Sequence, residues 1–391
     1  ERFLAGAAGA EGIQVDSRGY LDRVLYRRDP VPGAAVYLTV DLATQRAAEA
    51  ALEGEVGAVV ALDPATGAVL AMASSPGYDP AAFLPPAETE LIRALMSDPS
   101  LPLVNRATQG VYSPGSTFKP LVALAALESG AISGETRFTC TGAFFLGRRP
   151  FKCWLEKGHG AVAVEDALMY SCNVFFYNAG HRAGRDELVR VASAFGFDEP
   201  TGIDLPGERA GVAPTAAWRE RRGMRAWYPG DTVVMSIGQG YLSFTPLRAA
   251  TLIAAVANGG KLPRPFLVER VVSPLGETLL EGRPETAREI PLRPGDLALV
   301  QEGLRRAVNS RYGTGQKARL KGVEVAGKTG TVQVGTEERR KNHAWFIGYA
   351  PAGEPRIALA VLLEGRESGG FFAAPVAQKI LAAYFGVDLH G

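Results

Sequence analysis

Apolar and polar residues follow a regular pattern near the start of the main body of the chain. Asp41 precedes an alanine-rich stretch that extends to Leu52, and a capping carboxylate followed by strong helix formers predicts a helix between these two residues. Two apolar runs follow, at residues 57–63 and 67–73. They are joined across residues 63–66, Asp-Pro-Ala-Thr, which are residue types that favour turns. The two runs therefore predict a β-hairpin.

The C-terminal part of the chain has a matching pattern. Strand-like apolar runs occur at residues 323–334, 343–349 and 356–363, and residues 373–385 repeat their apolar positions with the period of a helix. Between the strand-rich ends, residues 115–310 are predicted to be mostly helices broken by Gly- and Pro-rich loops. The sequence therefore predicts a mixed α/β (α+β) fold, in which an antiparallel sheet from both chain ends is flanked by helices and carries a large helical insertion.

Residues 1–35 differ in composition from the rest of the chain. They are rich in Gly and Ala, contain two short alternating stretches, and end in the turn-forming sequence Pro-Val-Pro-Gly. This segment is too short to hold a core of its own, and we interpret it as the remnant of an N-terminal pedestal or linker, with the main domain over residues 36–391. The chain begins with Glu1 rather than Met, so we expect that an anchor or signal segment has been removed.

Composition and charge narrow the class of protein. The chain has 391 residues, of which 47% are hydrophobic and 21% charged, values typical of a soluble globular protein with a well-filled core. Its formal net charge is +1, from 42 basic and 41 acidic side chains. Such a balance gives no excess of positive charge that would bind nucleic acid or an anionic membrane surface. The apolar runs also fall short of the roughly 18 residues that a membrane span requires.

Ser116 and Lys119 lie three residues apart at the start of a predicted helix. Pro114 and Gly115 favour a turn just before the apolar run 121–127, so both side chains are expected on one face of the helix start. A serine hydroxyl becomes a good nucleophile when a base takes its proton, and a lysine can do so only when its pKa is lowered. The N–H groups of a helix start also suit a developing oxyanion. Taken alone, the spacing is better explained by a capping serine and a solvated lysine.

Two further short motifs change this interpretation. They are Ser171-Cys172-Asn173 and Lys328-Thr329-Gly330-Thr331, and each alone is explained as well by a polar turn. Each occurs once, and the order Ser-x-x-Lys, Ser-x-Asn, Lys-Thr-Gly is the signature shared by penicillin-binding proteins and serine β-lactamases. The third motif lies within a strand pattern, where glycine permits close approach of a substrate and a strand edge can bind an extended peptide. The ordered set predicts acyl transfer on a peptide-like substrate.

The resemblance extends well beyond these motifs. From about residue 36 to its end, the chain resembles the transpeptidase domain of class B penicillin-binding proteins, and most closely the elongation-specific type. Residues 1–35 resemble the tail of the N-terminal pedestal of that family. The segments that carry the likeness are residues 105–119, 201–208, 227–232, 236–241, 245–246 and 343–351.

The resemblance implies a peptidoglycan D,D-transpeptidase of cell-wall elongation. Ser116 would attack the penultimate D-Ala carbonyl of a stem peptide and release the terminal D-Ala. Lys119 would be the general base, Ser171 would relay a proton to the leaving amine, and Asn173 would bind the donor amide and fix Lys119. Lys328 would add positive charge that keeps Lys119 neutral and attracts the substrate carboxylate. An amine of a second stem peptide would then take the acyl group, and β-lactams would trap the serine.

The same resemblance implies the substrate-binding residues. The hydroxyls of Thr329 and Thr331 would bind the terminal carboxylate, and Gly330 would let the substrate backbone approach the strand. The backbone N–H groups of Ser116 and Thr331 would form the oxyanion hole. No cofactor is expected for catalysis.

Partners and location are also implied by the resemblance. The expected partners are peptidoglycan stem peptides, β-lactams, a membrane-embedded SEDS-family glycosyltransferase of the RodA type, and rod-complex proteins. The expected place is the periplasmic or extracytoplasmic face of the cytoplasmic membrane, with an N-terminal anchor that this chain lacks.

The three cysteines and one histidine form a candidate metal site. Cys140, Cys153, His159 and Cys172 have the spacing C-x12-C-x5-H-x12-C, and three thiolates with one imidazole are a complete tetrahedral set for structural zinc. The resemblance adds that some relatives of the elongation type carry metal ligands, of mixed type, at corresponding positions. The alternatives are buried thiols that pack as small apolar side chains, or one disulfide with one thiol left over. A bound zinc would be structural and would tie this segment to the turn that carries Ser171.

Two other functions remain open at the level of the sequence. A serine β-lactamase shares the motifs and the fold, although the chain length and the absence of an obvious added base for hydrolysis favour a transpeptidase. A β-lactam sensor, or a scaffold that regulates a partner glycosyltransferase, needs no turnover. The intact set of motif residues argues against loss of catalysis.

Overall fold

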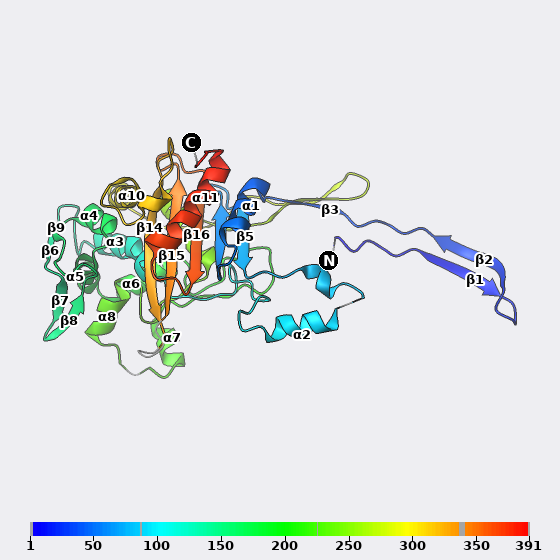
Figure 1. The fold of residues 1–391 in the computed structure, drawn as a ribbon, viewed down its shortest axis with the longest axis horizontal. Coiled ribbons are helices and arrows are strands. Elements are labelled where there is room, and N and C mark those ends of the chain that lie inside the picture. Colours follow the sequence, from blue (N-terminus) through cyan, green and yellow to red (C-terminus); the bar gives the residue numbers. More distant parts are fainter. Residues whose placement is uncertain (1–2, 87, 225, 336–340, 390–391) are drawn as a thin grey trace. The chain divides into compact units, whose positions relative to one another are not determined.

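The chain divides into two compact units in the computed structural model, which describes residues 3–86, 88–224, 226–335 and 341–389 (Figure 1). The first unit comprises Glu1–Thr39 and Phe266–Arg283, and the second comprises Val40–Pro265 and Pro284–Gly391. The first unit thus takes a segment from far along the chain. The domain boundary at residue 35 stays a prediction.

The smaller unit is built from short antiparallel strands. A hairpin pairs β1 (Ala10–Val15) with β2 (Leu21–Arg28). A separate sheet has the order β12-β11-β3 and contains β3 (Ala35–Leu38), β11 (Val268–Val272) and β12 (Thr278–Glu281). The pairing of β3 with β11 explains why the later segment belongs to this unit.

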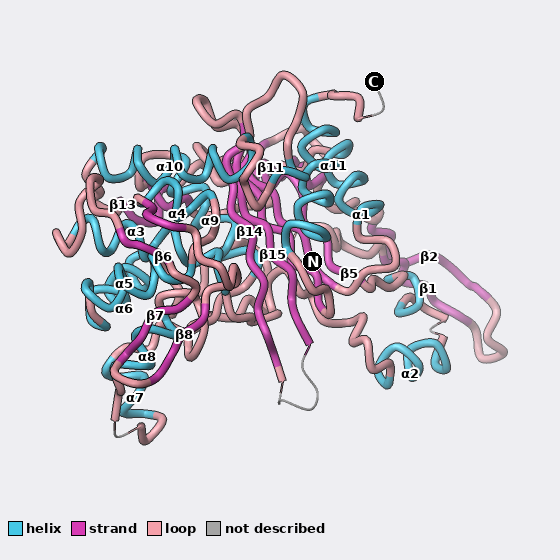
Figure 2. Tube along the Cα trace, turned by 60° about the vertical axis from the view of Figure 1, so that its left-hand side comes forward, coloured by secondary structure: helices cyan, strands magenta, loops and turns pink. Residues whose placement is uncertain are grey.

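The larger unit is organised around a five-stranded antiparallel sheet with the order β14-β15-β16-β4-β5 (Figures 1 and 2). Two strands come from the N-terminal part of the unit and three from the C-terminal part, and they meet where β16 pairs with β4. This confirms the predicted sheet from both chain ends and the predicted hairpin. The strands are β4 (Gly57–Leu62), β5 (Val69–Ser75), β14 (Ala326–Val334), β15 (Lys341–Ala350) and β16 (Ile357–Glu364).

Helices cover the sheet, as Figure 1 shows for α1 (Leu42–Ala51) and α11 (Ala374–Phe385). Asp41 caps α1 by accepting a hydrogen bond from the backbone of Thr44, as the capping pattern predicts. Both helices contribute to a buried apolar cluster with side chains of the central strands. In addition, α9 (Pro246–Ala257) is largely apolar and buried along nearly its whole length, as expected of a core helix.

The predicted helical insertion lies between β5 and β14. Its longer helices agree with the sequence pattern, whereas several strands of three or four residues were not predicted, because so few residues carry no period. The further helices are α2 (Thr89–Ser97), α3 (Lys119–Glu128), α4 (Val164–Met169), α5 (Asn173–Ala183), α6 (Arg185–Ala194), α7 (Ala216–Arg221), α8 (Pro229–Met235) and α10 (Pro294–Asn309). The short strands are β6 (Phe138–Cys140), β7 (Ala143–Leu146), β8 (Arg149–Lys152), β9 (Gly160–Val162), β10 (Lys261–Pro263) and β13 (Thr286–Glu289).

The described residues also contain four tight helical turns. They are η1 (Pro80–Phe83), η2 (Gly115–Phe118), η3 (Gln316–Ala318) and the π-helical turn η5 (Gly369–Ala373). Within the described part of the chain, no helix combines the length and the apolar character that a membrane crossing requires.

Candidate active site

The turn that carries Ser116 is tightly packed against β14. Ser116 lies in η2, and Lys119 is the first residue of α3, so the predicted helix start is present in a 3-10 form. Gly115 has a φ of +55° and donates a backbone hydrogen bond to Gly238 at 2.8 Å. A Cβ at Gly115 would lie 2.6 Å from Val332 Cγ2. Only glycine fits this position, and the close approach places Ser116 beside the strand of the third motif.

Ser171 has an unusual backbone conformation between α4 and α5. Its φ is +54°, which is uncommon for a residue other than glycine and persists only where surrounding contacts hold it. Those contacts come from Lys119, whose Nζ donates to the Ser171 carbonyl oxygen at 2.8 Å and to Asn173 Oδ1 at 2.7 Å. Lys119 Nζ also lies 3.2 Å from Ser171 Oγ. The structure therefore brings the first two motifs together as the sequence predicts.

Lys328 approaches the same hydroxyl from β14. Its Nζ donates to Ser171 Oγ at 2.9 Å and to the Thr329 carbonyl oxygen at 3.0 Å. Lys328 and Lys119 are both fully buried. Ser171 Oγ thus lies between two amines from different elements. Among the hydrogen bonds of the described residues, none joins Lys119 to the Ser116 hydroxyl.

Burial changes the proton affinity of both lysines. Loss of hydration lowers the pKa of Lys119 to about 8, although the thiols of Cys172 and Cys153 act in the opposite direction. Burial also holds the pKa of Lys328 well below its ordinary value, and the charge of Lys119 lowers it further. The chief cause of the lowered Lys119 pKa is therefore burial rather than the charge of Lys328. An amine with this property can take up a proton near neutral pH.

The motif residues line one cavity of about 690 Å³. Ser116, Ser171 and Asn173 lie on its insertion side, and Thr329, Gly330 and Thr331 come from β14, which is an edge strand of the sheet. The two lysines lie buried beneath them. Ten side chains that line this cavity were not predicted as site residues: Trp154, Ile237, Gln239, Tyr312, Thr314, Gln316, Lys317, Glu367, Ser368 and Phe371.

The turn η2 and the strand β14 are in contact next to Ser116 and Thr331. A Cβ at Gly330 would lie 3.0 Å from Thr117 Cγ2 and 3.2 Å from the Pro114 carbonyl oxygen, so the strand and the turn are in close contact. Ser116 follows Pro114 in this turn, and Thr331 follows Gly330 in the strand. Their N–H groups therefore belong to two segments that touch, which is the arrangement an oxyanion hole requires.

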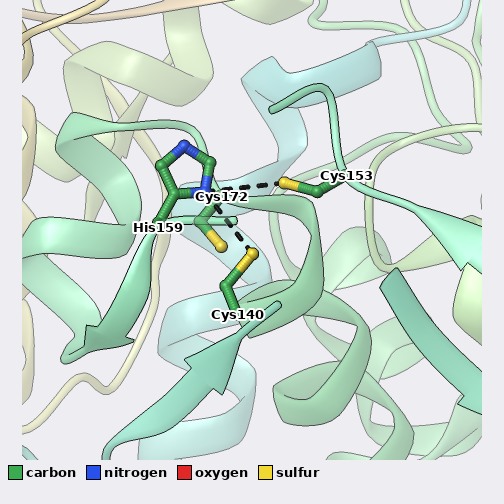
Figure 3. Close-up of side chains that lie close together, drawn as sticks. All are labelled: Cys140, Cys153, His159 and Cys172. Atoms are coloured by element: carbon green, nitrogen blue, oxygen red, sulfur yellow. Dashed lines mark hydrogen bonds between the residues drawn. The ribbon is translucent and has the colours of Figure 1, made fainter. Parts of the chain in front are cut away.

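The four candidate metal ligands meet in a single cluster (Figure 3). Cys140 ends β6, Cys153 follows β8, His159 precedes β9, and Cys172 is the N-cap residue of α5. Their ligand atoms all lie within 4.8 Å of one another, and all three cysteines are free thiols, so the alternative of a disulfide is not realised. Each thiol is buried. The cluster is adjacent to the site because Cys172 stands between Ser171 and Asn173.

The distances in this cluster fit a tetrahedral metal site. With Zn–S near 2.3 Å and Zn–N near 2.0–2.1 Å, a tetrahedral angle places sulfur and nitrogen about 3.6 Å apart. His159 Nδ1 lies 3.5 Å from Cys140 Sγ and 3.6 Å from Cys153 Sγ. His159 Nε2 is buried and has no hydrogen-bond partner. The donor set and its spacing therefore match zinc.

Comparison with known proteins identifies the family. Residues 57–382 match the penicillin binding protein transpeptidase domain. The peptidoglycan D,D-transpeptidase MrdA of Haemophilus influenzae is 36% identical over 407 residues, which cover 98% of this chain and 61% of that protein. PbpA of Mycolicibacterium smegmatis is 35% identical over 384 residues, which cover 91% and 73%. The chain spans about three fifths of the length of the MrdA proteins it matches.

Solved structures of related proteins share the fold. Pseudomonas aeruginosa PBP2 in complex with WCK 5153 is 38% identical with a TM-score of 0.85, over 93% of this chain and 78% of that one. A chain from a peptidoglycan synthase complex that coordinates polymerization and crosslinking is 35% identical with a TM-score of 0.87, over 99% and 69%. PBP2 of Helicobacter pylori in complex with MreC is 27% identical with a TM-score of 0.83, over 98% and 70%. The chain therefore belongs to the penicillin-binding protein transpeptidase family, among the class B members of the elongation type.

Proposed function

We propose that this chain is the transpeptidase part of a peptidoglycan D,D-transpeptidase that works in cell-wall elongation through an acyl-enzyme on Ser116. The observation that carries the proposal is the meeting of three motifs at one hydroxyl: Lys119 and Lys328 both contact Ser171 Oγ, inside a cavity that Ser116 also lines. This arrangement supplies a nucleophile, a base of lowered pKa and a proton relay within one site.

Acylation begins with attack of Ser116 Oγ on the carbonyl carbon of the penultimate D-Ala. The hydroxyl proton passes to the neutral amine of Lys119, and the backbone N–H groups of Ser116 and Thr331 stabilise the oxyanion. The peptide C–N bond then breaks. The leaving amine of the terminal D-Ala takes the proton of Ser171, and Lys119 returns a proton to Ser171. The product is an ester on Ser116 and one released D-Ala.

Transfer to the acceptor reverses these proton movements. The amine of a second stem peptide attacks the ester carbonyl, gives up a proton through Ser171 to Lys119, and forms the new amide as Ser116 leaves and regains its proton. Asn173 holds Lys119 by accepting its hydrogen bond at 2.7 Å, and its amide is available to the donor peptide. Lys328, whose pKa is lowered by burial, holds the Ser171 hydroxyl at 2.9 Å and does not act as a fixed cation for the substrate carboxylate. The Thr329 and Thr331 side chains complete the carboxylate site on that strand.

We also propose that Cys140, Cys153, His159 and Cys172 hold a structural zinc. The sulfur–nitrogen spacing of about 3.5–3.6 Å supports this assignment. Four protein ligands fill the tetrahedral shell, so the ion would stabilise the fold and leave no coordination position for substrate. Its expected effect on the site is indirect, through Cys172, which fixes the segment that carries Ser171 and Asn173.

The proposed partners follow from the relatives. The likeness to a chain of a peptidoglycan synthase complex, and to PBP2 in complex with MreC, supports a SEDS-family glycosyltransferase of the RodA type and rod-complex proteins as partners. The proposed substrate lies outside the cytoplasmic membrane, so we place the domain on its extracytoplasmic face.

The activity is tested with a synthetic stem peptide that ends in D-Ala-D-Ala and an amine acceptor. We expect the wild type to release D-Ala and to form the cross-linked product, and Lys119→Ala to do neither, because the variant lacks the buried amine that is proposed to take the proton of Ser116. Hydrolysis of the peptide without transfer would contradict transpeptidation. Rapid turnover of a chromogenic cephalosporin would instead favour a β-lactamase.

A further inference from the structure

Thr314 lines the active-site cavity although it belongs to none of the three motifs. It lies in the loop between α10 and η3 and is half-buried. Its backbone N–H donates to the Met169 carbonyl oxygen at 3.3 Å, and the next residue, Gly315, donates to the Ala307 carbonyl oxygen at 2.8 Å. The loop is therefore fixed by contacts to α4 and α10, and the side chain of Thr314 has a defined position.

The Thr314 hydroxyl accepts the hydrogen of a motif residue. Thr329 Oγ1 donates to Thr314 Oγ1 at 3.0 Å. A hydroxyl has one hydrogen to donate, so the hydrogen of Thr329 is already used, whereas that of Thr314 is not used in this bond. Thr329 is also only 8% exposed. A ligand in the cavity can therefore accept the Thr314 hydrogen, whereas the Thr329 hydrogen is already engaged.

Thr331 presents its hydrogen in the same way. Its Oγ1 accepts a hydrogen bond from the backbone N–H of Gly369 at 3.3 Å, which leaves its own hydrogen for a ligand. Both Thr314 and Thr331 line the cavity, and Lys328 lies beneath this wall with its Nζ on the Thr329 carbonyl oxygen. Two hydroxyl donors next to a buried amine form a site for an anion with two oxygens.

We infer that Thr314 is a further substrate-binding residue, whose hydroxyl donates to the carboxylate at the end of the donor peptide and to the carboxylate of β-lactams. This inference changes the role proposed above for Thr329: its hydroxyl would hold Thr314 through the hydrogen bond of 3.0 Å, and Thr314 and Thr331 would contact the carboxylate oxygens. The inference deepens the proposed function and rests on it, because the carboxylate is that of the proposed D-Ala-D-Ala substrate.

The test compares ligands that differ only in the carboxylate. Time-resolved intact-protein mass spectrometry gives the acylation rate constants with benzylpenicillin and with its methyl ester. Loss of one hydrogen bond to a charged group is expected to slow acylation of Thr314→Val by benzylpenicillin about 10- to 100-fold. The rate with the methyl ester is expected to equal that of the wild type. Thr314→Ser retains the hydroxyl and is expected to restore most of the rate.

A matched control and a comparison variant sharpen the result. Thr286→Val makes the same change on the exposed strand β13, away from the cavity, and is expected to leave both rates unchanged. Thr329→Val is expected to slow acylation by benzylpenicillin less than Thr314→Val does, because Thr329 acts through Thr314. Melting temperatures of all variants report any effect on folding.

The outcomes separate this inference from the proposed function. Equal rates for Thr314→Val and wild type with benzylpenicillin would overturn the inference alone. A loss of the same size with both ligands would also overturn it, since the effect would not depend on the carboxylate. A wild-type chain that neither ligand acylates would contradict the proposed function, and the inference with it.

Discussion

Two buried lysines determine what the site can do at the scale of single residues. Lys119 and Lys328 have lost their water, and both contact the hydroxyl of Ser171. Since water stabilises an ammonium group more than a protein interior does, burial lowers the pKa of each. A side chain that is ordinarily protonated at neutral pH thereby becomes able to accept a proton from a serine.

The pH dependence of acylation follows from the pKa of Lys119, which burial lowers to about 8. Only the neutral amine can accept the proton of Ser116, and its fraction rises as the pH increases through that value. We expect the acylation rate with benzylpenicillin to rise about tenfold per pH unit below the pKa and to level off above it. Mass spectrometry from about pH 6 to about pH 10 measures the profile.

The control for this prediction replaces the base by a cation that cannot lose its proton. Lys119→Arg is expected to show no acylation at any pH in this range, because arginine stays protonated. A wild-type rate that is constant or falls as the pH rises would show that Lys119 is not the base.

The active-site residues that belong to short motifs could be predicted from the sequence, whereas the other residues that line the cavity could not. Ser116, Lys119, Ser171, Asn173 and Lys328 were predicted because three weak patterns occur once each and in a known order, and the structure brings them together at one site, with the two lysines buried. The aromatic side chains and the threonine that complete the cavity come from loops and from the short turn η5, which have no period or motif. Their position depends on tertiary contacts that a single sequence does not display.

At the scale of elements, the end of β16 holds the segment that leads to the nucleophile. Glu364, the last residue of β16, accepts hydrogen bonds from Arg106 Nε at 2.9 Å and from the Tyr112 hydroxyl at 2.7 Å. The Arg106 side chain is only 5% exposed. The backbone of Tyr112 in turn pairs with Phe244. Because Tyr112 lies four residues before Ser116, this carboxylate fixes the approach to the active-site turn.

Glu364→Gln removes the charge that pairs with a buried arginine. We expect the free energy of unfolding to fall by about 1.5–3 kcal/mol, the contribution of a hydrogen bond to a charged group, and acylation to slow because the turn at Ser116 is held less firmly. Urea unfolding and the acylation rate measure the two effects.

Glu90→Gln is the matched control, since Glu90 and Arg93 form an exposed pair on α2, and a change below about 0.5 kcal/mol is expected there. Equal effects of the two variants would contradict the role of Glu364.

The Cys/His cluster joins the short strands of the insertion to the start of α5. If it holds structural zinc, the purified protein contains about one zinc per chain by elemental analysis, and a chelator lowers its melting temperature. His159→Ala is expected to lose the metal and to melt at a lower temperature. His181→Ala, outside the cluster, is expected to retain it. Protein that contains no zinc and is unaffected by chelator would remove the assignment.

Helices and strands that are specified by local residue patterns were predicted well. Strands that form only by pairing with a distant part of the chain were not. The helix that starts at Asp41 and the hairpin after it follow from capping, propensity and turn chemistry. By contrast, β3 pairs with β11, more than two hundred residues away in the sequence. Local residue patterns contain no information on such a pairing, so the assignment of residues 266–283 to the first unit could not be predicted.

At the scale of the whole molecule, the site forms where the helical insertion meets the edge of the central sheet. The sheet brings the two ends of the larger unit together and presents β14 as an edge strand. The insertion brings the nucleophile turn and the Ser171 turn against that edge. Neither part holds the full set of reacting groups, so the chemistry depends on their packing.

The central claim is that Ser116 forms a long-lived acyl-enzyme. Intact-protein mass spectrometry after incubation with benzylpenicillin tests it most directly, on the wild type and on Ser116→Ala. We expect a stable adduct of one drug mass on the wild type and none on the variant. An unmodified wild type with intact drug would contradict it and favour a scaffold that regulates a partner glycosyltransferase, whereas an adduct on both proteins would place the nucleophile elsewhere.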